Sequence, residues 1–229
     1  MKGHWLTMRQ RLRVTFAKGE RLKYISHLDL ARLWERALRR AGMPLAYSRG
    51  FNPRPKMTFA SALPLGFTSQ GEVMDVILER RLSPLHFAQR MKEQLPDGME
   101  LVSVEEVYPA LPSLQSQVRF SEYLVAVASE ESREEMEERL QQALAAEHLP
   151  RQRRGKAYDL RPLISKLWIE GQEAGCYLIG MQLRAGEGGT GRPDEVLACL
   201  GLADSARSIQ RRRLILAGGP TTENETSGR

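Results

Sequence analysis

Strand and helix patterns alternate along residues 9–107 in an order that few folds accommodate. Leu12, Val14 and Phe16 alternate with polar side chains, which predicts a strand over residues 9–16. An apolar repeat of helical period follows it, then two short strands, a second helical repeat and a closing strand. The order strand-helix-strand-strand-helix-strand predicts a ferredoxin-like arrangement, in which two helices cover one face of an antiparallel sheet.

The predicted helices of this half have clear boundaries. Ser26 is a good N-cap for the first helix, and Gly42 closes that helix. Ser83 followed by Pro84 starts the second helix, because proline is favoured at the first helical position. The two helices are predicted at 26–42 and 83–95, and the later strands at 57–62, 73–78 and 99–107.

The same order loosely repeats after a proline-containing linker at residues 108–117. Strands are predicted at 120–128, 163–170, 177–183 and 209–216, and helices at 130–147 and 193–200. We therefore predict an α+β protein with two tandem ferredoxin-like (βαββαβ) domains and antiparallel sheets. The predicted domains span residues 9–108 and 118–217, and the polar residues 218–229 are predicted to form a disordered tail.

Positive charge is concentrated at one end of the chain. Residues 1–60 hold 14 Lys and Arg against 3 Asp and Glu, a net of +11, whereas the whole chain of 229 residues nets +6. This segregation indicates that the N-terminal half meets an anionic partner. No apolar run is long enough to span a bilayer, and no apolar signal core follows the basic first residues, so we expect a cytoplasmic protein without a membrane partner.

Several classes of enzyme are disfavoured by the composition. The two cysteines, Cys176 and Cys199, predict neither a disulfide framework nor a metal site, and they cannot supply the three thiolates of a radical-SAM iron–sulfur cluster. The four histidines are scattered, and no phosphate-binding loop or nucleophile elbow is present. We therefore expect no cofactor or metal, and neither a metalloenzyme nor a nucleotide-driven motor.

The strongest candidate site is the segment 47–56, here called the basic loop. Pro53 and Pro55 restrict the backbone, so the loop is predicted to be stiff. Arginine suits phosphate, and aromatic rings stack on bases of any sequence. An alternative interpretation is a solubilising loop in which Phe51 fills the core. The predicted RNA-binding residues here are Lys23, Tyr47, Arg49, Phe51, Arg54 and Lys56.

Three further basic or glycine-rich segments are weaker candidates. Arg153, Arg154 and Lys156 form a second basic cluster and are predicted to add to the RNA-binding surface. The glycine-rich run 186–193 precedes a predicted helix and is either an anion site or a flexible loop. The arginines of the first strand line the open face of the sheet or a solvated edge: Arg9, Arg11 and Arg13.

His27 is the one candidate for a catalytic role. It lies in the first turn of a predicted helix, where positive partial charges favour the neutral imidazole. A neutral imidazole can act as general base on a ribose 2′-hydroxyl, with Arg54 or Lys56 stabilising the charge on phosphorus. The alternative is that His27 belongs to the helix cap or hydrogen-bonds the neighbouring loop.

Six motifs of this chain resemble the uncharacterised radical-SAM-linked protein family of bacteria. The resemblance covers roughly residues 8–216, and its N-terminal motifs are specific; the motifs lie at 24–30, 37–48, 50–56, 62–66, 159–163 and 191–195. Members occur alone or fused behind a B12-binding radical-SAM protein, near genes for an RNase E/G-type ribonuclease and ribosomal proteins. The resemblance implies an accessory protein in RNA or ribosome biology, here in its stand-alone form, and gives no catalytic residues to carry over.

Three functions are compatible with these observations. The leading hypothesis is an RNA-binding accessory protein that presents ribosomal or transfer RNA to a separate B12-binding radical-SAM protein. The second is a metal-free endoribonuclease that uses His27, since tandem ferredoxin-like domains with a histidine near the first helix also resemble CRISPR repeat-processing endonucleases. The third is a protein-only adaptor whose basic face binds an acidic radical-SAM partner.

Overall fold

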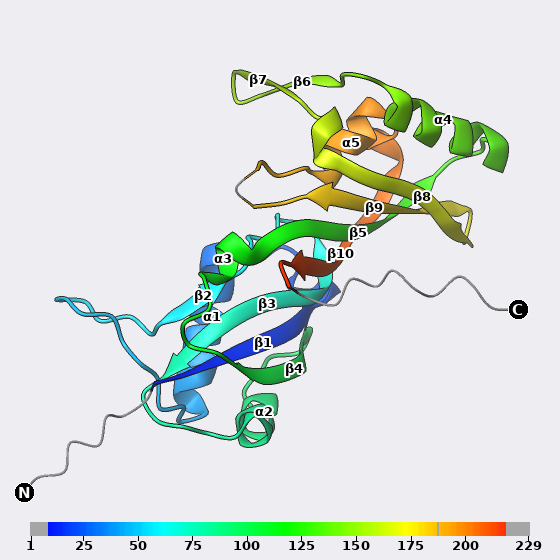
Figure 1. The fold of residues 1–229 in the computed structure, drawn as a ribbon. Helices are drawn as coiled ribbons and strands as arrows, with labels where there is room; N and C mark the ends of the chain where they lie inside the picture. Colours follow the sequence, from blue (N-terminus) through cyan, green and yellow to red (C-terminus); the bar gives the residue numbers. More distant parts are fainter. Residues whose placement is uncertain (1–8, 187, 219–229) are drawn as a thin grey trace, which may run out of the picture.

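A computed structural model describes residues 9–186 and 188–218, so the predicted tail lies outside the described residues apart from Gly218. One eight-stranded sheet forms the centre of the molecule, with seven strands in the order β4-β1-β3-β10-β5-β9-β8 and β2 paired with β3 (Figure 1). The strands are β1 (Gln10–Lys18), β2 (Met57–Phe59), β3 (Thr68–Leu78), β4 (Met99–Val107), β5 (Val118–Ala128), β8 (Ile164–Glu173), β9 (Cys176–Arg184) and β10 (Ala206–Leu216).

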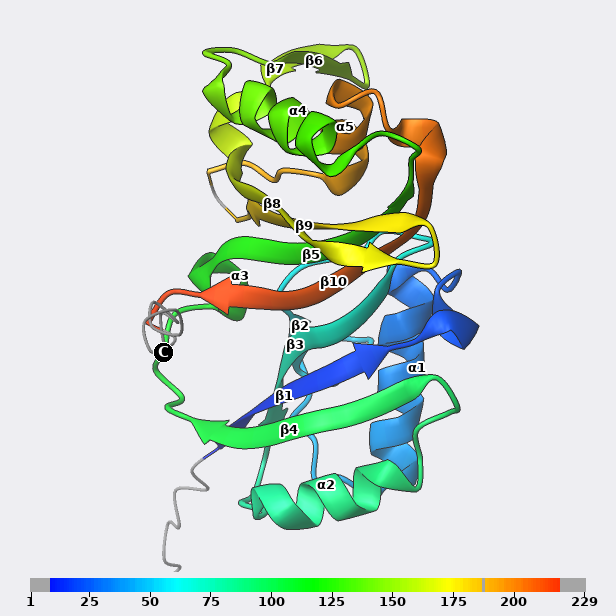
Figure 2. The same ribbon diagram turned by 90° about the vertical axis from the view of Figure 1, so that its right-hand side faces the viewer.

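The N-terminal half places its two helices against the strands β4, β1 and β3 (Figure 2). Helix α1 (His27–Arg40) starts at Ser26, whose side chain accepts a hydrogen bond from the backbone N–H of Asp29. Helix α2 (Pro84–Lys92) starts in the same way at Ser83. The core between helices and strands is fully buried and contains Leu12, Val14, Phe16, Trp34, Leu38 and Phe87.

The C-terminal half has helices α4 (Arg133–Ala145) and α5 (Pro193–Cys199) on strands in the order β10-β5-β9-β8. It also holds a two-stranded hairpin that the sequence did not predict, formed by β6 (Pro150–Arg153) and β7 (Lys156–Asp159). Short 3₁₀ turns complete the chain: η1 (Glu20–Leu22), η2 (Arg161–Leu163) and η3 (Ala203–Ser205). The predicted α+β class is confirmed, as is antiparallel pairing within each half.

The two halves are joined where β3 and β10 pair in parallel, a junction here called the seam. Only Gln210 with Thr68 and Arg211 with Ser69 are in register there. The Arg211 guanidinium forms a fully buried ion pair with Glu72, and its Nε donates to a Glu72 carboxylate oxygen at 2.7 Å. The sheets of both halves are therefore continuous, and the division into two tandem domains at 9–108 and 118–217 stays a prediction.

The segment 108–117, predicted as a linker, packs on the face of the sheet opposite α1. Its last four residues form the short helix α3 (Leu114–Gln117). Leu114 is buried against Val118, Val73 and Leu214, so this segment covers the seam. The segment therefore does more than connect the two halves, because it buries apolar side chains from both.

Candidate nucleic-acid interface

The basic loop projects from the body of the molecule between α1 and β2 (Figure 1). Two backbone hydrogen bonds close it, from Ser48 N–H to the Arg54 carbonyl at 2.9 Å and from Lys56 N–H to the Ala46 carbonyl at 2.8 Å. Its base is held on β3, because Ile77 donates its N–H to the Lys56 carbonyl at 2.9 Å. The loop is therefore a hydrogen-bonded hairpin and not an open excursion of the chain.

The side chains at the tip of the basic loop point into solvent. Phe51 is completely exposed, with a relative accessibility of 106%, so the alternative in which it fills the core is wrong. Arg49 and Arg54 are exposed as well. Neither they nor Lys56 forms an ion pair with any residue in the described part of the chain. The loop thus presents uncompensated positive charge beside an aromatic ring.

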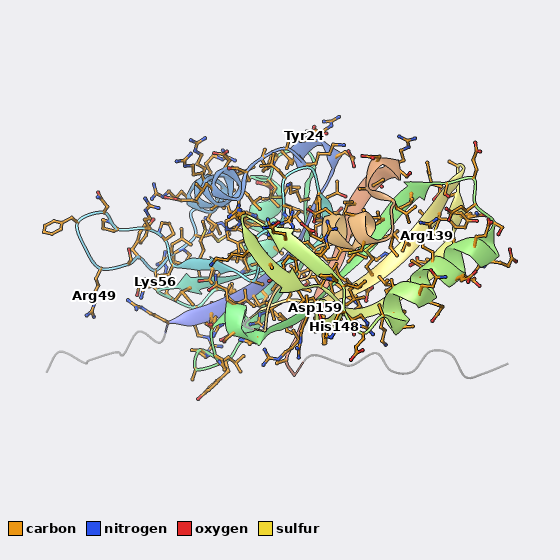
Figure 3. The ribbon with its side chains drawn as sticks, turned by 90° about the horizontal axis from the view of Figure 1, so that it is seen from above. Tyr24, Arg49, Lys56, Arg139, His148 and Asp159 are labelled. Atoms are coloured by element: carbon orange, nitrogen blue, oxygen red, sulfur yellow. The ribbon has the colours of Figure 1, made fainter. Side chains whose placement is uncertain are left out.

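Two of the predicted RNA-binding residues, Tyr47 and Lys23, already interact with neighbouring side chains. The guanidinium carbon of Arg39 lies 5.9 Å from the centre of the Tyr47 ring, which is 38% exposed. Lys23 pairs with Glu20 at 2.7 Å, and the hydrogen bond that its ammonium group donates to the Glu20 carboxylate raises the pKa of Lys23. Figure 3 shows Tyr24, the neighbour of Lys23, well apart from Arg49 and Lys56. The structure therefore does not bring Lys23 together with the basic loop.

The second basic cluster lies at the tip of the β6–β7 hairpin, in the other half of the molecule. Arg154 and Gly155 have φ values of 50° and 77°, as the two central residues of a type I′ turn require. The turn exposes Arg153, Arg154 and Lys156. Arg151, in contrast, is paired with Glu195 on α5 at 2.9 Å and so fastens the hairpin to the body.

The arginines of the first strand do not form an open binding face. Arg11 and Arg13 are buried and both pair with Asp75 on β3, at 2.6 and 3.0 Å. Arg11 also donates to the carbonyl of Leu111 at 2.8 Å, so the segment 108–117 covers it. The interpretation of an open basic face or a solvated edge is therefore wrong for these two residues. The sequence does contain a signal for this burial. Asp75 is an acidic residue in the middle of an apolar strand, which indicates that it pairs with a buried cation.

His27 is the first residue of α1, and its ring lies 5.2 Å from the ring of Phe59 in an edge-to-face contact. The imidazole forms no hydrogen bond within the described ranges 9–186 and 188–218. Its observed neighbour is thus an aromatic ring of β2. The capping role belongs to Ser26, so the alternative in which His27 itself caps the helix is not what the structure shows.

The glycine-rich run 186–193 leads into α5, and Glu187 lies outside the described residues. Asp194 and Glu195 occupy the first turn of α5, and Arg192 pairs with Asp194 at 2.9 Å. These carboxylates already occupy the positive end of the helix. The local charge therefore disfavours the interpretation as an anion site.

Residues 9–186 and 188–218 contain neither a cluster of metal-ligating side chains nor a membrane-spanning helix. No group of three or more His, Cys, Asp and Glu side chains in these ranges is arranged to hold a metal ion. None of the helices described there is long and apolar enough to cross a membrane.

Comparison with known proteins shows the family. Residues 11–193 match the family described as "Uncharacterized protein conserved in bacteria (DUF2344)", and the chain belongs to it. None of the curated proteins compared with the chain matches it.

The similar solved structures have very low sequence identity to this chain. A chain in the crystal structure of a Cbf5-Nop10-Gar1 complex aligns with 90% of this chain at a TM-score of 0.50 and 8% identity. A chain in the structure of an H/ACA RNP bound to a substrate RNA containing 2′-deoxyuridine aligns at a TM-score of 0.47 and 8% identity, again over 90% of this chain. This chain spans about half the length of those chains, 48% and 47%. At such identity the likeness concerns the fold alone.

Proposed function

We propose that this member of an uncharacterized bacterial family binds RNA through the basic loop and acts as an accessory protein in RNA or ribosome maturation. The observation that carries the proposal is the loop itself, a closed hairpin that presents Arg49, Arg54 and Lys56 without ion-pair partners in the described part of the chain. Cations that are not neutralised within the protein release the counterions of a phosphate backbone when they bind it.

The second basic cluster, at the tip of the β6–β7 hairpin, supports the same proposal from the other half of the molecule. Arg153, Arg154 and Lys156 are exposed at a tight turn, and Arg151 fastens this hairpin to α5. In the proposal each half is a ferredoxin-like domain that contributes one basic projection. The continuous sheet holds the two projections on one body, so both can contact one folded RNA.

In this proposal the chemistry belongs to a separate B12-binding radical-SAM protein, as the family resemblance implies, and this chain supplies RNA binding. The described surroundings of His27 do not favour the alternative of an endoribonuclease. The ring contacts Phe59, and no hydrogen bond within the described residues orients it for proton transfer.

The proposal is tested by fluorescence anisotropy of labelled transfer-RNA and ribosomal-RNA fragments across a salt series. Replacing Arg49, Arg54 and Lys56 together by Ala is expected to weaken binding at least ~10-fold at low salt. Because three phosphate contacts are lost, the slope of log affinity against log salt is expected to become shallower by about 2. A matched triple variant removes the same charge from exposed positions of the C-terminal half: Arg133→Ala, Lys166→Ala and Arg207→Ala.

The two triple variants separate the possible outcomes. Weakening confined to the loop variant supports the site. An equal loss in the control variant would show that only total charge matters, and the site assignment would be wrong. If the wild-type protein binds neither RNA at low salt, the RNA proposal fails, and the protein adaptor with an acidic partner becomes the function to pursue.

A further inference from the structure

Phe51 is exposed to a degree that packing does not explain. Aromatic side chains bury roughly 150–250 Å² in folded proteins, whereas Phe51 keeps a relative accessibility of 106%. The other exposed large apolar side chains retain at least a quarter of their surface against the protein, with Tyr24 and Tyr108 highest at 72%. Phe51 therefore gains nothing from the fold, and its apolar surface is free for a partner.

The basic loop fixes the ring in this exposed position. Ser48 and Arg54 exchange two hydrogen bonds across the base of the tip, at 2.9 Å between backbone groups and 3.0 Å from Arg54 N–H to the Ser48 hydroxyl. Gly50 has a φ of 130°, a conformation that side-chain-bearing residues rarely adopt. Pro53 restricts the far side of the tip. Little conformational freedom is thus left to lose when the ring binds.

Tyr47, the second aromatic residue of the loop, is less available. Arg39 lies over its ring, and Tyr47 pairs with Pro55 across the loop. Stacking by the basic loop is therefore assigned to one ring, that of Phe51.

The surroundings of Phe51 favour a nucleic acid over a protein or a membrane. Arg49 and Arg54, both exposed, precede and follow it in the sequence, so the charged side chains nearest to Phe51 along the loop are cations. A stable protein interface needs about 800 Å² from each partner, and an interfacial membrane anchor needs a continuous apolar face. One ring between two arginines provides neither, but it matches one base between two phosphates.

We infer that the RNA site recognises an unpaired base, which stacks on Phe51 while Arg49 and Arg54 contact the adjoining phosphates. This inference rests on the proposed RNA-binding function and names its substrate class, RNA with a bulge, loop or single-stranded end. In a paired helix the faces of the bases are covered by their neighbours, and proteins reach only the grooves and the backbone. An extruded base offers the free face that an aromatic ring requires.

The test compares two fluorescein-labelled RNA hairpins that differ only in one unpaired adenine bulge. Anisotropy titrations are made with the wild-type protein, Phe51→Ala and Phe51→Trp, with Leu65→Ala as a control at another exposed apolar position. Phe51→Ala is expected to weaken binding of the bulged hairpin roughly 5- to 150-fold, the range measured when stacking residues are replaced by Ala. Binding of the fully paired hairpin is expected to stay unchanged. Phe51→Trp and Leu65→Ala are expected to retain the preference for the bulge.

The outcomes distinguish this inference from the proposal beneath it. If Phe51→Ala weakens both hairpins equally or neither, while the Arg49/Arg54/Lys56 triple variant weakens both, RNA binding stands and recognition of an unpaired base is overturned. If no RNA binds with salt sensitivity, the proposed function itself fails. Because Phe51 has no packing contact to lose within the described residues, its variants are expected to melt at the wild-type temperature, which a thermal scan checks.

Discussion

Asp159 shows how one carboxylate can organise a turn at the surface. It accepts hydrogen bonds from the backbone N–H groups of Leu149 and Arg161, at 2.8 and 3.0 Å, and lies 2.8 Å from Nδ1 of His148 (Figure 3). The His148 contact and the two backbone donors lower the pKa of Asp159 from 3.8 to about 2. The ionised form is therefore favoured in the folded state over the unfolded state.

The lowered pKa of Asp159 predicts that Asp159→Asn lowers the melting temperature by an amount that depends on pH. A carboxylate with a lowered pKa stabilises the fold above its unfolded pKa, and the contribution is lost as the pH falls towards the folded value. The variant is expected to melt below the wild-type protein at about pH 6, and the gap is expected to narrow between about pH 4 and pH 2. Thermal scans across this range check it, with Asp204→Asn as a control at an exposed aspartate. A difference in melting temperature between the variant and the wild-type protein that stays constant with pH would contradict the assignment of this stabilisation to the ionised Asp159 carboxylate.

Single residues also show what the sequence could and could not predict. Helix caps follow from local chemistry, so the N-caps Ser26 and Ser83 could be predicted and are confirmed. Burial of Arg11 depends on Asp75, a partner 64 residues away, and no local pattern reports that distance. The exposure of Phe51 likewise depends on contacts that no local pattern reports, so the sequence is compatible with both an exposed and a buried ring.

At the scale of elements, strand periodicity predicted most of the sheet but not its exceptions. The closing strand of the N-terminal half was predicted at 99–107 and is found as Met99–Val107. The β6–β7 hairpin was missed, because its exposed basic residues lack the apolar alternation of a half-buried strand. Its turn signal, Gly155 after Arg154, was present within the basic cluster.

Strands β8 and β9 depend on a glycine for their close pairing. Gly180 lies opposite Trp168, and a Cβ added there would lie 2.0 Å from Cε2 of the indole. Gly180→Ala is therefore expected to destabilise the protein by about 1–3 kcal/mol, as overpacking does. Urea unfolding measures this, and Gly171→Ala on β8 is the matched control because its added methyl meets open space.

A double variant identifies the cause of this loss. If the clash with the indole is responsible, adding Trp168→Ala to Gly180→Ala is expected to cost less than the sum of the two single changes. Strict additivity would show that the methyl group acts elsewhere, for example on the unfolded chain.

At the scale of the whole molecule, the buried pair of Arg211 and Glu72 links the two halves. Burial alone would lower the pKa of Arg211, but the charge and hydrogen bonds of Glu72 raise it overall, so the guanidinium stays charged. Nearby Lys18 is also buried, and desolvation lowers its pKa while Glu72 opposes that effect. Glu72 thus compensates positive charge from β1 as well as from β10.

Removing one member of the pair of Arg211 and Glu72 is expected to destabilise the folded protein strongly. Glu72→Gln leaves Arg211 buried without a counterion and is expected to lower the free energy of unfolding by about 3–5 kcal/mol. The control is Glu170→Gln, since the pair of Glu170 with the next residue, Arg212, is partly exposed and is expected to contribute at most about 1 kcal/mol. Urea unfolding measures both variants.

A third variant completes this comparison. Replacing both partners, as Glu72→Leu with Arg211→Met, is expected to be less damaging than Glu72→Gln, because the guanidinium is then no longer left buried without a counterion. If Glu72→Gln and Glu170→Gln lower the free energy of unfolding by similarly small amounts, the seam does not have a central role in stability.

The parallel pairing of β3 with β10 also bears on synthesis of the chain. Ser69 and its partner Arg211 are 142 residues apart, so most of the chain must leave the ribosome before the seam can close. Until then, β3 carries Glu72 without its cation, and the edge that receives β10 is open to other strands. The C-terminal half therefore covers this edge of β3 only late in synthesis. A chain truncated before β10 would leave the edge unpaired and free to hydrogen-bond to strands of other chains.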